Sequence, residues 1–392
     1  MRNFTFILII YATYIALGLP DSLLGVAWPE MVGEFHVPYS AAGIISMTIA
    51  ICTVISSLQT IKITNKVGTG KLVLGSVAFT VIGLIGFALT QNYFLLLVLA
   101  LPLGFGAGAI DTSVNDYVAA NFKAHHMNWL HAFWGGGATL GPIIMGVTLS
   151  NHFSWRHGYL IIGGIQLLLV IILFLTLPLW KQNEGKKKLA NELDEKTSST
   201  REILKRKGVI FSLLSFLVYV GLEGTIFLWG SSYLIEVKSL SAVSASFIIS
   251  VFFASVTVGR IISGFITFWV SNQKLLLLSQ LLLMIGIFTA AFGTSSVLYV
   301  GFLLIGLGCA AIFPTMMHET PRRFGERDSS AIIGFQVASG YVGITVLPPL
   351  VGVVFQNLSM NLFPLFLVIF TLLLLGATIV IEKGSTLKAS KY

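Results

Sequence analysis

Three acidic residues, Asp21, Asp111 and Glu223, lie within long apolar stretches of this sequence. A carboxylate inside hydrocarbon is costly, so an acid found there faces a cavity, has a partner or carries a proton. A carboxyl group that alternates between a dry and a wet environment can bind a proton on one side of a membrane and release it on the other. We predict that these acids couple proton movement to another process. Structural hydrogen bonding to a neighbouring helix is the alternative.

Polar and aromatic side chains share these stretches with the acids. Aromatic faces combined with amides and carboxylates suit a sugar, which offers apolar C–H faces and a rim of hydroxyls. Trp and Tyr also populate membrane interfaces and helix contacts, so a packing role stays open for them. The predicted substrate-binding residues are Asn115, His131, Trp134, Trp229, Tyr233, Gln336 and Tyr341.

Charged and polar groups near the ends of the apolar stretches form a second set. Arg260 is the basic residue that we place inside the membrane, where it can pair with an acid or reach the interface. We predict gate or structural charge roles for Asn65, Lys66, Asp116 and Arg260, and gate or loop contacts for His318 and Glu319.

The elements that must position these residues are membrane-spanning helices. Hydrophobic residues make up 55% of the 392 residues and charged residues 10%. A helix needs about 20 apolar residues to cross a hydrocarbon core of about 30 Å. The predicted spans are 4–33, 39–64, 72–90, 93–121, 127–150, 156–180, 208–236, 240–270, 273–292, 295–320, 328–356 and 360–382. Such a chain is an all-α membrane protein rather than a soluble enzyme, and no pattern in it calls for a cofactor or a metal.

The pattern of basic residues predicts the orientation. Lys and Arg gather in the loops on one side of these spans, as they do in cytoplasmic loops, so we expect both termini to be cytoplasmic in a cell (plasma or inner) membrane. The net charge of +8 then needs no nucleic-acid partner. The polar segment 181–207 predicts a cytoplasmic linker between an N-terminal six-helix bundle, 1–180, and a C-terminal bundle with a short tail, 208–392.

The two predicted bundles resemble each other in sequence. LPLGFGAGAIDT at 101–112 aligns with LLIGLGCAAIFP at 303–314, and the same offset brings Asp21 onto Glu223. Matches in the first and fourth spans of each half indicate a duplicated six-helix unit, with coincidence among apolar segments as the alternative. Two such halves favour a transporter that rocks about a central site over a channel, since no repeated filter loop or ring of like charge occurs.

On these residues the sequence resembles the major facilitator superfamily, and within it the fucose permease-like sugar:proton symporters. GFGAGAIDTSVNDY at 104–117 is similar to that family's glycine-rich stretch with an acid and an Asn four positions later, here Asp111 and Asn115. GLPDSLL is similar to the first-span segment that carries an acid, here Asp21. The resemblance implies that Asp21 and Asp111 are the proton- and sugar-linked pair, and that His131 lies at a substrate-contacting position.

The sequence departs from that family in three places. The first cytoplasmic signature is reduced to Asn65, Lys66, Gly68 and Lys71, without its Asp; Asp111 replaces the more usual Glu; and His131 replaces an amide. GGGATLGPIIMG at 135–146 also resembles a motif of proton antiporters. We therefore predict a proton-coupled symporter of a monosaccharide or related polyol, working without an obligate protein partner. A proton-coupled exporter of drugs or amphipathic metabolites, and a non-transporting receptor of the same fold, are the alternatives.

Overall fold

The computed structural model describes residues 2–122, 124–183, 200–206, 208–325 and 328–389. Within these ranges the chain is almost entirely helical, and twelve segments are long and apolar enough to cross a membrane. The predicted all-α membrane fold with twelve spans is confirmed. Most boundaries differ from the predicted ones by a few residues, as for 208–236 against Val209–Glu236.

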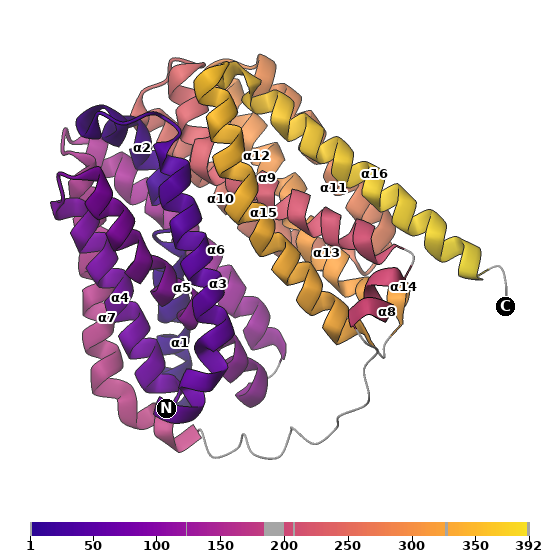
Figure 1. Cartoon of the computed structure of the whole chain (residues 1–392), viewed down its shortest axis with the longest axis horizontal. Coiled ribbons are helices and arrows are strands. Elements are labelled where there is room, and N and C mark those ends of the chain that lie inside the picture. Colours follow the sequence, from indigo (N-terminus) through magenta and orange to yellow (C-terminus); the bar gives the residue numbers. More distant parts are fainter. Residues whose placement is uncertain (1, 123, 184–199, 207, 326–327, 390–392) are drawn as a thin grey trace. The chain divides into compact units, whose positions relative to one another are not determined.

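Seven helices form the N-terminal half, and Figure 1 shows them as long rods packed along one another. They are α1 Arg2–Gly18, α2 Leu23–Phe35, α3 Ala41–Val67, α4 Thr69–Leu89, α5 Tyr93–Asn121, α6 Ala124–Ser150 and α7 Trp155–Asn183. The chain divides into two compact units, 1–191 with 230–253 and 192–229 with 254–392. The predicted domain boundaries stay a prediction.

The first predicted span is broken into two helices at Pro20. Proline cannot donate a backbone hydrogen bond, so the ladder that closes α1 ends at Leu19, whose N–H donates to the Ile15 carbonyl at 3.1 Å. Helix α2 then begins at Leu23. Asp21 lies in this interruption, where its side chain is exposed.

The C-terminal half contains both long helices and short ones. They are α8 Thr200–Lys205, α9 Val209–Glu236, α10 Ala242–Ile266, α11 Asn272–Phe292, α12 Ser296–Ala310, α13 Ile312–His318, α14 Thr320–Phe324, α15 Ser329–Asn357, a 3₁₀ turn Met360–Leu362, and α16 Phe363–Ala389. The tenth predicted span, 295–320, is divided at Ala311 between α12 and α13. Pro314 lies in the first turn of α13, where its missing N–H costs least.

The end of the predicted linker belongs to the packed structure. Residues 184–199 lie outside the described ranges, but Ile203 of α8 is buried in an apolar cluster with Val209 and Ile332. The Arg206 guanidinium pairs with the Asp328 carboxylate and donates to the Phe324 carbonyl at 2.9 Å. Figure 1 shows α8 and α14 beside one end of α15. The last residues of 181–207 are therefore not a purely solvated linker.

The internal repeat extends to the contacts between helices. A Cβ atom on Gly137 of α6 would meet the backbone of Ile15 in α1, and one on Gly343 of α15 would meet the backbone of Leu217 in α9. Ile15 and Leu217 are 202 residues apart, and Gly137 and Gly343 are 206 apart. The first and fifth spans of each half therefore approach at equivalent glycines, which allow close backbone contact.

Candidate functional site

A polar cluster joins α1 to α5 in the N-terminal half. The Tyr14 hydroxyl donates to Asp111 Oδ1 at 2.9 Å and lies 3.2 Å from the Asp111 carbonyl oxygen. Asn115, one turn further along α5, donates from Nδ2 to the same Oδ1 at 3.0 Å. Two donors thus hold one carboxylate oxygen in place. The Asn115 Oδ1 atom is buried and accepts no hydrogen bond from the described residues.

His131 of α6 completes this cluster from a third helix. Its ring meets the Tyr14 ring edge to face, with centroids 5.9 Å apart and planes at 85°. The His131 side chain is exposed, whereas Tyr14 is almost fully buried. Tyr14 therefore contacts both Asp111 and His131, and His131 has room to contact a ligand.

Asp21 belongs to a second contact between α1 and α6. The Trp134 indole Nε1 donates to Asp21 Oδ2 at 2.7 Å, and the break at Pro20 presents the carboxylate to it. Asp21 is also close enough to Asp111 for their charges to interact. The structure thus brings together five predicted residues, Asp21, Asp111, Asn115, His131 and Trp134.

Glu223 has a different environment in the C-terminal half. Its Oε1 lies 3.9 Å from an Arg260 guanidinium nitrogen, and both side chains are mostly buried. The Tyr219 hydroxyl, one turn earlier on α9, donates to the Cys309 carbonyl at 2.8 Å. A carboxylate beside a guanidinium is charge-balanced. Glu223 is therefore paired with a cation, in contrast to Asp111, whose carboxylate accepts from the neutral donors Tyr14 and Asn115.

Two of the predicted substrate-binding residues use their polar groups inside the C-terminal half. The Trp229 indole donates to the Pro348 carbonyl at 2.8 Å and is fully buried. Gln336 is also buried; its amide donates to Ser212 Oγ at 2.7 Å and exchanges hydrogen bonds with Thr320 at 2.9 and 3.0 Å. In this conformation both residues support helix packing.

The remaining predicted residues are spread along the chain. Tyr233 is buried, with the Lys238 ammonium 5.8 Å from its ring centroid, and Tyr341 is half-buried on α15. Asn65 and Lys66 are exposed at the end of α3, and Asp116 is exposed on α5. These positions are not part of the cluster around Asp111 described above.

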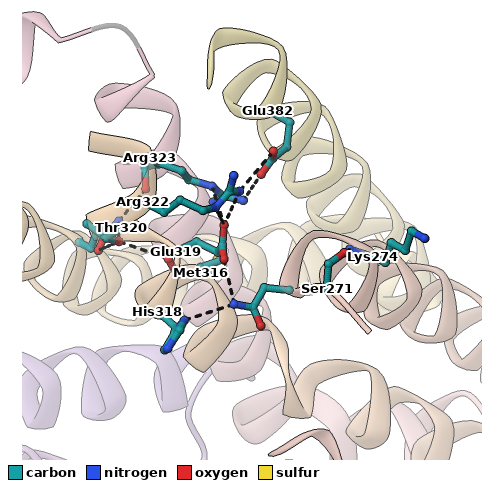
Figure 2. Close-up of polar contacts among 12 residues, drawn as sticks. Ser271, Lys274, Met316, His318, Glu319, Thr320, Arg322, Arg323 and Glu382 are labelled. Atoms are coloured by element: carbon teal, nitrogen blue, oxygen red, sulfur yellow. Dashed lines mark hydrogen bonds and ion pairs between the residues drawn. The ribbon is translucent and has the colours of Figure 1, made fainter. Parts of the chain in front are cut away.

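A separate ionic cluster links α14 to α16, and Figure 2 shows its side chains converging. The Arg323 guanidinium pairs with the Glu382 carboxylate, and Arg322 pairs with Glu319 and lies 3.6 Å from Glu382. Asn272 at the start of α11 donates to Glu319 Oε1 at 2.8 Å and contacts His318 Nδ1 at 3.2 Å. The predicted contacts of His318 and Glu319 near the end of a span are thus located in this network. Sequence reasoning missed Arg322, Arg323 and Glu382.

The pKa of Glu319 is lowered by this network. Burial alone raises it, but the hydrogen bonds from Asn272 and Arg322 and the charges of Arg322 and Arg323 outweigh that effect. The pKa of Arg322 is raised, first by its hydrogen bond to Glu319. Arg323 and Glu319 are both nearly inaccessible, so the cluster fixes α14 to its neighbours through buried charge.

Tyr14 is the main residue that sequence reasoning missed in the N-terminal cluster. The internal repeat carries a signal for it, because an offset of 202 residues matches Tyr14 with Phe216 and Asp111 with Phe313. Phe216 and Phe313 are in contact, with centroids 5.1 Å apart and an edge-to-face arrangement. Equivalent helices therefore meet through two phenylalanines in one half and through a hydroxyl and a carboxylate in the other.

Comparison with known proteins identifies similar membrane transporters. Residues 10–317 match the Major Facilitator Superfamily. The chain is 26% identical over 318 residues to the glucose/mannose transporter GlcP of Bacillus subtilis, covering 76% of this chain and 75% of the relative. It is 23% identical over 389 residues to Bypass of stop codon protein 6 of Saccharomyces cerevisiae, covering 90% and 77%. A crystal structure of a mutant of the nucleoside transporter NupG has a TM-score of 0.77 at 14% identity, covering 96% of this chain and 98% of that one.

Proposed function

Because the chain belongs to the Major Facilitator Superfamily, whose members are membrane transporters and not enzymes, we propose that it is a proton-coupled symporter of a monosaccharide or related polyol. It would act as a single chain in the cell membrane, with both termini in the cytoplasm, and import its substrate by alternating access. The cluster around Asp111 is the observation that carries this proposal.

Asp111 has the contacts expected of a group that links a proton to a hydroxylated ligand. Its carboxylate is held by neutral donors, Tyr14 and Asn115, rather than by a cation. Protonation of a carboxylate held by neutral donors leaves no cation without a partner, whereas protonation of Glu223 would remove the charge that balances Arg260. We therefore assign the coupling to Asp111 and Asp21 and a charge-balancing role to Glu223.

The same cluster offers groups that suit sugar hydroxyls. The unused Oδ1 of Asn115 is a buried acceptor, so a substrate hydroxyl that reaches it would remove an unsatisfied polar group. The exposed His131 ring contacts Tyr14, and the Trp134 ring donates to Asp21, so the two rings provide a polar and an apolar surface at the cluster. Tyr233 and Tyr341 are the candidates that we retain from the second half of the chain.

One relative supports a sugar substrate. GlcP is a glucose/mannose transporter, and the alignment with it spans about three quarters of both chains. A proton that enters down a membrane potential releases about 2.3 kcal/mol per 100 mV, which can concentrate a neutral sugar. Neither Trp229 nor Gln336 is needed in this scheme, because their polar groups are already used in packing.

Uptake into proteoliposomes tests the proposal. An imposed pH gradient, alkaline inside, should drive accumulation of radiolabelled D-glucose or D-mannose by the full-length protein. Asp111→Asn should abolish this accumulation but retain exchange of sugar at equal pH, because the neutral amide mimics the protonated acid. Glu30→Gln, at an exposed acid of α2, is the matched control and should behave as the wild type.

Two results would contradict the proposal. If Asp111→Asn accumulates sugar as the wild type does, Asp111 does not couple the proton. If neither sugar is transported, but an imposed gradient expels a lipophilic cation such as ethidium, the chain is the proton-coupled exporter that the motif at 135–146 suggests.

A further inference from the structure

We propose that Tyr11 and His126 form a relay that passes protons between the membrane-embedded carboxyls and water at the start of α6. The proposal rests on the proposed function and adds a route for the proton. Neither Tyr11 nor His126 is among the predicted site residues.

The pair lies at the border of the apolar span. The Tyr11 hydroxyl and His126 Nδ1 are 2.7 Å apart and join α1 to α6. His126 is the third residue of α6, three positions before the apolar span that begins at Trp129, and its side chain is half-buried. Tyr11 is buried within the first span. The hydrogen bond thus connects a group inside the span to a titratable ring outside it.

Tyr11 is connected to Asp111 through Tyr14, which lies on the same face of α1. Tyr14 follows it by three positions, so their side chains are neighbours, with about 5–6 Å between Cβ atoms. The Tyr14 hydroxyl donates to Asp111 and its ring touches His131. One bridging water between the two tyrosine hydroxyls would make the path continuous.

The proton steps balance along this path. Tyr11 gives its hydroxyl proton to His126 Nδ1 as its oxygen accepts another from the inner water, so the phenol is neutral before and after. His126 passes through the imidazolium form and releases the proton from Nε2 to bulk water, which leaves Nδ1 protonated. Exchange of ring protons with water then restores the Nε2–H tautomer, which can accept from Tyr11 again. Uptake in the other direction reverses each step.

Aromatic side chains hold the pair in place. Phe133 stacks on Tyr11, with centroids 4.5 Å apart and planes at 24°. Phe122 and Trp129 both meet the His126 ring edge to face at 5.4 Å. These contacts restrict the rings to orientations in which the hydrogen bond persists.

The C-terminal half builds the same contact from apolar residues. The offsets of the repeat match Tyr11 with Leu213 and His126 with Ile332. Leu213 packs against the buried cluster that contains Ile332. At this position of the repeat the C-terminal half therefore packs without a polar pair. The N-terminal half carries titratable residues at two successive equivalent contacts, Tyr11 with His126 and Tyr14 with Asp111.

Other titratable groups lie on α6 and on the helices that pack against it. Besides Tyr11, they include Tyr14 on α1, Asp111, Asp116 and Tyr117 on α5, and His131 on α6.

The test separates proton transfer from sugar binding in the full-length protein, with radiolabelled D-glucose as the probe. His126→Gln and Tyr11→Phe should each slow pH-gradient-driven uptake about tenfold, since a positioned proton-transfer group contributes at least that much. Equilibrium exchange at equal pH should stay within about twofold of the wild type, because it moves no net proton. The matched controls are His157→Gln, an exposed histidine of α7, and Tyr93→Phe, which loses a hydrogen bond to the Ala41 carbonyl.

Chemical rescue distinguishes a relay from a structural role. Imidazole buffer should restore driven uptake by His126→Gln, since a diffusing base can replace the missing ring, and should not change the controls. Wild-type driven uptake in both variants, loss of exchange in parallel with driven uptake, or no rescue by imidazole would each overturn the relay. Absence of driven uptake in the wild type would instead overturn the proposed function, and the relay with it.

Discussion

Tyr14 donates its hydroxyl hydrogen to the Asp111 carboxylate at 2.9 Å, and this bond joins α1 to α5. The corresponding helices of the other half meet through Phe216 and Phe313. Because packing at this contact is achieved by two apolar rings, the polar pair is not required for the fold. Burial of a hydroxyl and a carboxylate at this contact replaces apolar packing that the other half retains. This replacement indicates that the Asp111 carboxylate has a functional role.

Replacing Tyr14 and Asp111 with the phenylalanines found at the equivalent positions of the C-terminal half tests folding and transport separately. Tyr14→Phe with Asp111→Phe should leave the apparent unfolding temperature in detergent close to that of the wild type, but should abolish driven uptake. Asp111→Phe alone removes the carboxylate acceptor of the buried Tyr14 hydroxyl, leaves it the backbone carbonyl at 3.2 Å, and should cost about 1–3 kcal/mol. Thermal unfolding and driven uptake, measured for the two single variants and the double variant, give the effect of each substitution on stability and on transport. A double variant less stable than Asp111→Phe would show that the polar pair is structural after all.

The same Trp→Phe substitution should affect mainly transport at Trp134 and mainly stability at Trp229. Trp134→Phe removes the bond to the exposed Asp21, so driven uptake should weaken, by up to roughly tenfold, with little change in stability. Trp229→Phe removes a bond to the buried Pro348 carbonyl and should lower stability by about 1–3 kcal/mol while proton coupling is kept. Uptake kinetics and thermal unfolding of both variants provide the comparison. Equal loss of transport in the two would refute the assignment of Trp134 to the site.

The sequence predicted the helices well, because apolar length alone defines a membrane span. The interruption of the first span lies at Pro20, whose effect on the backbone is local. The division of 295–320 at Ala311 was not predicted, although Pro314 follows it closely. Proline in the first turn of a helix does not by itself reveal that a new helix has begun.

The side-chain partners could be predicted only in part. Asp111 and Asn115 are one turn apart on one helix, so their contact follows from spacing. The contact of Tyr14 with Asp111 depends on how α1 packs on α5, and Gln336 is bound by Ser212 and Thr320 from separate elements. Such partners are set by tertiary packing, although comparison of the two halves position by position points to Tyr14.

The pairing of Glu223 with Arg260 leads to a prediction about the second half. Glu223→Gln leaves a mostly buried guanidinium without its carboxylate and should destabilise the protein by roughly 3 kcal/mol. Adding Arg260→Met removes the guanidinium that Glu223 balances and should recover most of that loss. We expect the double variant to keep pH-gradient-driven uptake, with rates measured in proteoliposomes. Loss of coupling in a stable double variant would return Glu223 to the set of proton carriers.

The cluster around Glu319 gives a stability that depends on pH. Its pKa is lowered in the folded protein, so the ionised form is stabilised by Asn272 and the two arginines. This contribution is fully present above the pKa of an unfolded glutamate, about 4.3. It is lost as the pH falls through that value toward the folded pKa, because the unfolded state then binds the proton first.

Glu319→Gln should therefore unfold at a lower temperature than the wild type near neutral pH, by an amount equivalent to about 1–3 kcal/mol. The difference should shrink as the pH is lowered below about 4.3, since the wild-type carboxyl then becomes neutral as well. Thermal unfolding in detergent across this pH range measures the difference, and Glu30→Gln, at an exposed acid, should show none. A gap that stays constant with pH would mean that Glu319 acts through shape rather than charge. In that case the arginines of α14 would be held mainly by Glu382, to which Arg323 pairs directly.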